Sequence, residues 1–525
     1  MAISSVNGKM FKKMVTNGAI NLKNNCEYVN SLNVFPVPDG DTGINMSMTI
    51  DSGVTEINKC ESDSIIDLSK IFARGLLMGA RGNSGVSLSQ YFRGLSVAMK
   101  NLQKDTLGVE DLIYCFEQGK TVAYKAFKDP IEGTMLTVIR ESYEAVEGKS
   151  FDSVEALFDA YYEAAKVSVA NTPNLLPVLK EANVVDSGGE GFFIVLEGMY
   201  KALKGEMLEV VEEAADNSKE YTYEVSFKLI AKDSENFQAS DLRSELSLDG
   251  SVEVSVENGI ATIKAFTNEL GKELSLAQKY GDLVQIEVKN NALNDQLPEV
   301  KKDEPRKEIA LVSVAFGDGI KETFKELGCS VVINGGQTMN PSTESFVKAC
   351  EEANADNVII VPNNGNVIMA ADQAAKMIEG VNVRVLHAKT ISQGYASLMA
   401  FDETVSLDEN LEAMTEAVKA VKTGEVTYAV RDTNIGGIEI KANDFMGILD
   451  GEIVVSTKER LDATKTLLEK GIDEDSAVVT IFAGNGTTEE EISQIEEYIS
   501  TLNEDVECEV VDGKQDIYSY IISIE

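Results

Sequence analysis

The hydrophobic positions divide the chain into three regions with different periodicities. From Gly8 to about Gly205, apolar residues recur at the i, i+3, i+4 spacing of amphipathic helices, and glycine or proline separates many of the runs. Two such series are Met10, Phe11, Met14 and Val15, and Ile65, Leu68, Ile71, Phe72 and Leu76. The pattern predicts an all-α domain of roughly eight helices over residues 1–205.

An acidic stretch over residues 206–220 is typical of a linker, and a different pattern follows it. Alternating or β-rich runs predict strands, and two runs with helical spacing lie between them. The predicted strands are 221–231, 252–256, 260–266 and 283–288, and the predicted helices are 237–246 and 270–278. The order βαββαβ indicates a small α+β domain of the ferredoxin-like type over residues 219–290, followed by a polar linker over 290–307.

The third region, residues 308–525, alternates short β-rich runs with helical segments. The first predicted strands are 309–315, 331–333, 358–361 and 383–386. This alternation is typical of a parallel sheet with helices on its faces, and therefore predicts an α/β domain. Later runs extend it into a second α/β unit: 426–430, 438–441, 453–455, 478–482, 506–511 and 518–524.

The composition narrows the choice of partners and location. With 87 acidic residues against 47 basic ones, the formal charge of −40 argues against nucleic acid or an anionic membrane as the main partner. No apolar run approaches the ~20 residues of a membrane span, and no signal-peptide pattern opens the chain, so we expect a cytoplasmic protein. The six scattered cysteines form no C-x-x-C pair and indicate reduced thiols. The single histidine, His387, argues against a Ser-His-Asp triad, and we assign it no chemistry.

The most distinctive loop of the helical region carries two carboxylates, Asp39 and Asp41, on either side of Gly40. Carboxylates in this arrangement suit Mg²⁺ held against the phosphates of a nucleotide, with phosphate and water completing the coordination shell. Gly40 and Gly43 permit backbone conformations in which N–H groups approach an anion, and helical periodicity resumes just after Gly43. Taken alone, the same residues would form an Asx-type surface turn.

Three more glycine-bearing loops each precede a predicted helix: residues 79–85, 130–134 and 185–191. The first offers Ser84, the second Thr134 and the third Asp186. Each loop alone would be read as a helix cap or turn. If the four loops gather at one end of a helix bundle, their N–H groups and helix dipoles surround a polyphosphate. Together with the Asp pair they favour a magnesium–nucleotide site.

These residues resemble one family over essentially the whole chain. The motifs that carry the resemblance are Asn33 to Met46, Gly79 to Val86, Glu132-Gly133-Thr134, Thr172 to Leu176, Val185 to Gly189, Gly335 to Thr343, Pro362 to Asn366 and the closing Gln515 to Glu525. The chain is thereby similar to the dihydroxyacetone-kinase-like family, and within it to the kinase components of bacterial fatty acid kinase.

The resemblance implies a DhaL-type helical barrel that binds ATP at one end. Asp39 and Asp41 would hold two magnesium ions that bridge the phosphates, and Asn33 stands near a further Asp of simpler kinases. The implied nucleotide contacts are Thr42, Gly43, Asn45, Met46, Ser84, Gly85, Gly133, Thr134, Asp186 and Gly188. Asp39 and Asp41 would be the catalytic residues.

In this family, the kinase component does not bind the fatty acid itself. A separate lipid-binding carrier protein presents the carboxylate of the fatty acid, and the product is an acyl phosphate. A carboxylate is ionised at neutral pH and needs no general base, which agrees with a chain that has one histidine. One alternative is a dihydroxyacetone kinase, and an alternative of another class is a nucleotide-sensing scaffold without turnover.

Two features of the later regions bear on cofactors and partners. Relatives often carry a cysteine and a His-x-His pair suited to zinc in the middle domain, where this chain has Glu224, Lys264 and Phe266. We therefore expect no zinc, and Glu224 and Lys264 are either an ion pair or separate surface charges.

Two glycine-bearing loops of the third domain follow predicted strands and are either ligand loops or tight turns: Gly317-Asp318-Gly319 and Gly335-Gly336-Gln337-Thr338. The resemblance implies that the third domain docks the lipid-binding partner and forms a homodimer.

Overall fold

The computed structural model describes residues 3–34, 40–210, 222–232, 252–257, 260–290, 305–335 and 340–525. The chain folds into two compact units. Residues 1–210 and 306–525 form the first unit, which contains both the helical part and the α/β part, and residues 211–305 form the second. Asp39, the predicted helix 237–246 and Gly336 to Met339 lie outside the described residues.

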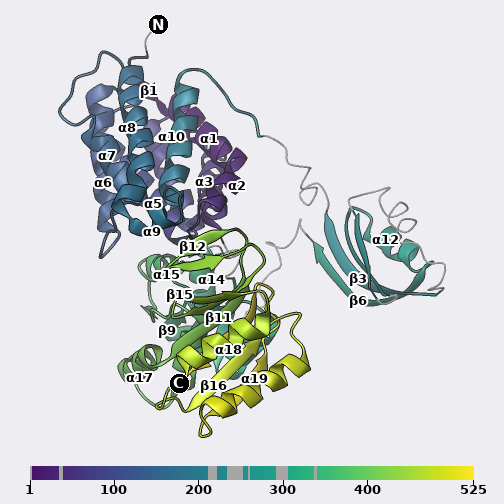
Figure 1. The fold of residues 1–525 in the computed structure, drawn as a ribbon. Helices are drawn as coiled ribbons and strands as arrows, with labels where there is room; N and C mark the ends of the chain where they lie inside the picture. The colour runs from purple at the N-terminus through teal and green to yellow at the C-terminus, as the bar shows by residue number, and fades with distance from the viewer. Residues whose placement is uncertain are drawn as a thin grey trace. The chain divides into compact units, whose positions relative to one another are not determined.

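The N-terminal part of the first unit is a helical bundle (Figure 1). Its helices are α1 (Gly8–Asn24), α2 (Cys26–Ser31), α3 (Thr42–Asn58), α4 (Ile65–Gly79), α5 (Gly82–Leu102), α6 (Val109–Lys125), α7 (Met135–Glu144), α8 (Val154–Leu175), α9 (Pro177–Glu181) and α10 (Ser187–Leu203). Short strands β1 (Val6–Asn7) and β2 (Thr106–Leu107) pair beside them. One aromatic chain joins three helices, because Phe72 of α4 contacts both Phe11 of α1 and Phe92 of α5 edge-on.

Glycines allow neighbouring helices of the bundle to approach closely. Gly94 of α5 faces α6, where an added Cβ would lie 2.3 Å from the carbonyl oxygen of Gln118. Gly119 of α6 faces back, and its Cβ would lie 2.7 Å from the ring of Tyr91. The backbones of α5 and α6 therefore come into direct contact. The two helices keep this alignment because glycine has no side chain at these positions.

The α/β part begins with a parallel four-stranded sheet in the order β10-β9-β7-β8. Its strands are β7 (Lys307–Ala315), β8 (Cys329–Asn334), β9 (Ala355–Val361) and β10 (Asn382–Val385). The helices along this stretch are α13 (Asp318–Glu326), α14 (Thr343–Glu352) and α15 (Ile368–Ala375). The four parallel strands predicted from the β-rich runs are therefore correct, and the apolar signal is clearest for β7 and β9, whose residues are mostly buried.

A second, mixed sheet follows in the order β15-β14-β11-β18-β16-β17. Its strands are β11 (Lys422–Tyr428), β14 (Phe445–Leu449), β15 (Glu452–Thr457), β16 (Val478–Ala483), β17 (Glu507–Asp512) and β18 (Tyr518–Ile524). Helices α18 (Arg460–Gly471) and α19 (Glu489–Leu502), coloured yellow in Figure 1, pack on one face through Leu467 and Ile495. Helices α16 (Ile391–Met399) and α17 (Leu407–Ala420) share an apolar core with both sheets.

The sequence pattern does not reveal some elements of the first unit. Helices α2 and α9 have 6 and 5 residues, too few for a helical period to be visible. Strand β14 has the sequence FMGIL beside a sharp turn and is absent from the predicted strands, as is β12 (Thr433–Ile435), which pairs with β13 (Ile438–Ile440). None of the described helices is long and apolar enough to cross a membrane.

The second unit contains an antiparallel sheet in the order β4-β5-β3-β6. Its elements are β3 (Tyr223–Ala231), β4 (Val252–Glu257), β5 (Ile260–Thr267), α12 (Leu270–Ala277) and β6 (Gly281–Asn290). These match the four predicted strands and the second predicted helix. Because the first predicted helix lies outside the described residues, the complete ferredoxin-like pattern stays a prediction. Glu224 and Lys264 form an ion pair of 3.0 Å rather than lying as separate surface charges.

We expect Gly94→Ala to lower the free energy of unfolding by about 2 kcal/mol, because overpacked sites of this kind must shift backbone. Thermal melting and urea titration would measure the loss. Gly365→Ala is the matched control, since a Cβ there would meet nothing within 4 Å. A Gly94→Ala protein as stable as the native chain would contradict the backbone contact between α5 and α6.

Candidate functional site

The starts of four helices, α3, α5, α7 and α10, meet at one cavity of about 790 Å³. Each of the four predicted loops contributes to its wall, with Asp41, Ser84, Thr134 and Asp186 among the lining residues. A helix start presents backbone N–H groups without helical partners and the positive end of the helix dipole. The gathering predicted from the four loops is therefore present, and it creates a surface suited to a polyanion.

Asp41 occupies the N-cap position of α3 and lines the cavity although it is only 8 % exposed. The neighbouring Thr42 donates its hydroxyl to Asn33 Oδ1 at 2.7 Å. Ser187, at the start of α10, donates to Thr42 Oγ1 at 3.2 Å. These hydrogen bonds join the first loop to the fourth, and the amide oxygen of Asn33 is already used as an acceptor within this contact.

Asn45 combines two signs of a binding site. It lines the cavity at 2 % exposure, and its side-chain oxygen Oδ1 is buried without a hydrogen-bond partner among the described residues. Gly82 lies beside it with φ at +61°, and a Cβ there would approach Asn45 Nδ2 to 2.8 Å. A buried acceptor without a partner costs free energy unless a ligand or water satisfies it.

Four of the predicted contact residues lie behind the cavity wall. Met46 is fully buried, and Gly85 and Gly43 are needed where α3 packs, since their Cβ atoms would approach Thr49 and Cys26 to 2.4 and 2.3 Å. The N–H of Gly43 donates to Asn30 Oδ1 at 2.8 Å. Gly133 has φ at +83° and packs against Leu176. The structure accounts for these residues by packing and turn geometry, and Gly188, like Thr42, does line the cavity.

Asp186 links the third and fourth loops through backbone groups. Its Oδ2 accepts the N–H of Gly189 at 2.6 Å and caps α10, and the backbone N–H of Met135, the first residue of α7, also bonds to this side chain. Burial raises the pKa of Asp186 to about 6, although these N–H groups act in the opposite direction. Its carboxylate therefore holds two helix starts beside each other.

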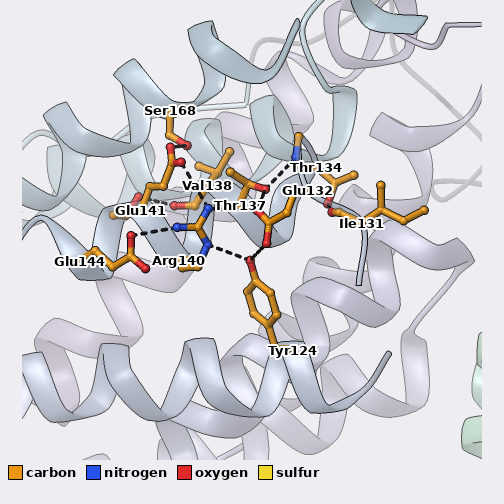
Figure 2. A network of polar contacts seen from close by, with 12 residues as sticks. Tyr124, Ile131, Glu132, Thr134, Thr137, Val138, Arg140, Glu141, Glu144 and Ser168 are labelled. Atoms are coloured by element: carbon orange, nitrogen blue, oxygen red, sulfur yellow. Dashed lines mark hydrogen bonds and ion pairs between the residues drawn. The ribbon is translucent and has the colours of Figure 1, made fainter. Parts of the chain in front are cut away.

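A polar network positions the third loop (Figure 2). Glu132 accepts from Arg140 at 3.0 Å, from Tyr124 at 3.0 Å and from Thr137 at 2.5 Å. Burial raises the pKa of Glu132, but these hydrogen bonds outweigh burial and lower it overall. Thr137 in turn accepts the N–H of Gly133 at 2.8 Å. The network fixes the loop that places Thr134 at the start of α7.

The opposite wall of the cavity comes from the α/β part of the first unit. Its lining residues include Asn366, His387, Lys389, Glu425 and Tyr518. Neither His387 nor Lys389 stands in a local motif, so the sequence gives no reason to place them at a site. His387 lies 3.2 Å from Asp372 and is more than half exposed.

Family models match both parts of the first unit. A DAK2 domain model matches residues 36–201, and a FakA-like C-terminal model, built for fatty acid kinase proteins, matches residues 310–525. An uncharacterized protein of Staphylococcus saprophyticus and protein YloV of Bacillus subtilis are each 40 % identical to this chain over the full length of both proteins. The chain belongs to the FakA-like, DAK2-domain family. The family recognised from the sequence motifs is therefore confirmed, and with it the helical N-terminal and α/β C-terminal regions.

The solved structures resemble the chain much less closely. A DegV family protein of Corynebacterium glutamicum is 17 % identical, with a TM-score of 0.33 over 42 % of this chain and 97 % of that one. The Fak B3 protein of Streptococcus pneumoniae, crystallised with linoleic acid, is 12 % identical, with a TM-score of 0.29 over 42 % and 99 %. The dihydroxyacetone kinase of C. freundii is 13 % identical, with a TM-score of 0.31 over 42 % and 48 %. Likenesses at these TM-scores carry no conclusion about this chain.

The residues of this DAK2-type cavity fit Mg²⁺ held together with a phosphate, and do not form a metal site by themselves. Across the described ranges, no three carboxylate, histidine or cysteine side chains gather closely enough to hold an ion. Asp41 and Asn45 both line the cavity, and each side chain has a hard oxygen donor. Magnesium accepts such a small protein set when phosphate oxygens and water supply the other ligands.

The raised pKa of Asp186 predicts a pH-dependent stability. Between its ordinary value of 3.8 and about 6, the native state holds the Asp186 proton more tightly than the unfolded state. This residue therefore lowers stability as pH rises through that window, by at most about 3 kcal/mol. Asp186→Asn removes the titration, so its melting temperature relative to that of the native chain should rise between pH 4.5 and pH 7. Asp152→Asn, at an exposed carboxylate, is the control. A constant difference between Asp186→Asn and the native chain at both pH values would refute the assignment.

Proposed function

We propose that the chain is the ATP- and Mg²⁺-dependent kinase component of a two-protein system. It transfers the terminal phosphoryl group of ATP to the carboxylate of a fatty acid held by a separate lipid-binding carrier protein. Membership of the FakA-like family supports a kinase-like function, and the meeting of four helix starts at one cavity carries the proposal for nucleotide.

The charges of the cavity wall favour a nucleotide that arrives with divalent cations. Asp41, Asp129, Asp186 and Glu425 line the cavity together with Lys389. In a chain of formal charge −40, such a wall repels a free polyphosphate unless cations neutralise it. Asp41 and the unpartnered oxygen of Asn45 would hold Mg²⁺, and Asp39 and Asn33 remain the other proposed ligands. Bound Mg²⁺ would supply charge neutralisation of the phosphates.

The proposed reaction needs no general base from this chain. A carboxylate oxygen of the fatty acid forms a bond to the γ-phosphorus, while the bond from that phosphorus to the bridging oxygen breaks. The products are an acyl phosphate and ADP, and no proton is transferred because the acceptor is already ionised. The residues of the four loops therefore bind and orient the phosphates, which is the main contribution in phosphoryl transfer.

The α/β part, the middle domain and the location of the protein complete the proposal. The α/β part would dock the carrier protein, and a basic patch on that carrier would complement this acidic chain. We also propose a cytoplasmic protein that forms a homodimer, and a ferredoxin-like middle domain without zinc. Dihydroxyacetone phosphorylation is the alternative within kinases, and a nucleotide-sensing scaffold is the alternative outside them.

Mg²⁺-dependent nucleotide binding should be lost when Asp41 is removed. In calorimetry, Asp41→Ala should weaken the affinity for ATP with Mg²⁺ at least tenfold, about 1.4 kcal/mol, because it deletes a proposed ligand. Affinity in excess EDTA should change little. Asp105→Ala, at an exposed aspartate of the same domain, is the control. A native chain without Mg²⁺-dependent nucleotide binding would refute the kinase function and favour a scaffold role.

Acyl phosphate formation distinguishes the two kinase reactions. With a carrier protein loaded with a defined fatty acid, ATP and Mg²⁺, hydroxylamine should trap the product as a hydroxamate, and Asp41→Ala should abolish it. Phosphorylation of dihydroxyacetone without any carrier would instead favour the alternative kinase.

A further inference from the structure

Asn340, a residue of the α/β part, contacts two of the four glycine-bearing loops that line the cavity. Asn340 is 1 % exposed, and its Nδ2 donates to Oδ2 of Asp41 at 2.6 Å. Its backbone carbonyl accepts from Nη1 of Arg81 at 2.5 Å. Asp41 belongs to the first loop, and Arg81, at the N-cap position of α5, belongs to the second. Asn340 therefore bridges the two loops from outside the helical bundle.

The surrounding contacts show that Asn340 lies in a packed interface. The N–H of Thr343, at the start of α14, donates to the carbonyl of Ala80 at 3.1 Å. Ala80 and Val86 of the helical part are buried in one apolar cluster with Phe346 of α14 and strands of the parallel sheet. Burial lowers the pKa of Arg81, which agrees with a guanidinium enclosed at this contact.

Arg431, a second residue of the α/β part, binds the residues just before the loop that carries Asp39 and Asp41. Arg431 donates to the carbonyl of Ser31 at 2.6 Å, to that of Val34 at 2.9 Å, and also to that of Asn33. Helix α2 ends at Ser31, where carbonyl groups lack helical partners and attract a cation. The anchored residues directly precede the segment that carries Asp39.

A donor that binds a metal-ligating carboxylate fixes the orientation of that carboxylate. Removing such an outer partner commonly weakens metal affinity about 10–100-fold. A carboxylate has two oxygens that can each accept more than one partner, so an amide and a cation can bind the same carboxylate. The amide then selects the direction in which Asp41 faces the cavity, and Arg431 holds the backbone of Ser31, Asn33 and Val34.

We propose that Asn340 and Arg431 are positioning residues of the α/β part, which complete the Mg²⁺–nucleotide site of the helical part. Asn340 orients the Asp41 carboxylate, and Arg431 anchors the residues before Asp39. This inference rests on the proposed function. It assigns a role to the motif Gly335 to Thr343: its asparagine docks on the kinase site.

Calorimetry with ADP tests the proposal without turnover, with Mg²⁺ and again in excess EDTA. The full-length variants are Asn340→Ala and Arg431→Met, and the controls are Asn434→Ala and Arg384→Met, at exposed positions of the same α/β part. Asn340→Ala should weaken Mg²⁺-dependent ADP affinity about tenfold or more and leave affinity in EDTA within about twofold. Arg431→Met should act in the same direction, and both controls should match the native chain. Circular dichroism and melting temperature verify folding.

The possible outcomes of this experiment can be told apart. Weaker Mg²⁺-dependent binding in both folded variants supports the positioning role. Unchanged binding refutes it, and tighter binding in Asn340→Ala also refutes it, because the amide would then compete with the cation for Asp41. If Asn340→Ala is unfolded, Arg431→Met alone decides. A native chain that binds no ADP with Mg²⁺ would refute the proposed function itself, whatever the variants do.

Discussion

The architecture of the helical part depends on the meeting of four helix N-termini at one cavity. Backbone N–H groups at these starts lack partners within their helices, and their dipoles repel one another when they converge. The carboxylate of Asp186 offsets part of this cost, because it accepts the N–H of Gly189 in α10 and also interacts with the backbone of Met135 at the start of α7. Its raised pKa is a measure of the desolvation that this arrangement costs. Close helix packing at glycine positions such as Gly43 and Gly85 then brings the loops near enough to share one cavity.

The site lies where two differently built parts of one unit meet. The helical part supplies N–H groups and carboxylate, and the α/β part supplies a second wall with Lys389 and the donors Asn340 and Arg431. Donors from the α/β part bind the carbonyl groups of Ser31 and Val34, at and just after the end of α2, and the carboxylate of Asp41. The contact between the helical part and the α/β part therefore combines apolar packing with hydrogen bonds.

Much of the fold could be predicted from the sequence because its signals are local. Helical spacing marks α1, α4 and α5, and β-rich runs mark the parallel strands, most clearly β7 and β9, whose residues are mostly buried. The gathering of the four glycine loops is predicted correctly as well. The contact of Asn340 with Asp41 could not be predicted, because it joins positions 299 residues apart and no periodicity links them. A glycine also indicates that another group approaches the backbone closely, but the sequence does not show whether that group is a ligand or a helix. Gly43 and Gly85 are examples, since both are tightly packed against the bundle.

The acidity of the chain and the charge of its proposed substrates both increase the electrostatic repulsion in the site. A fatty acid carboxylate and a triphosphate repel each other, and a wall rich in aspartate increases that repulsion. In the proposed reaction, catalysis would depend on cations held in fixed positions, because the substrate is itself the nucleophile and the chain would supply no base. The rigidity of the carboxylate proposed to hold those cations would then matter more than its basicity. Such a requirement would account for a buried polar contact of the interface that ends on Asp41, and for a second part of the chain that completes a site whose residues belong mostly to the first.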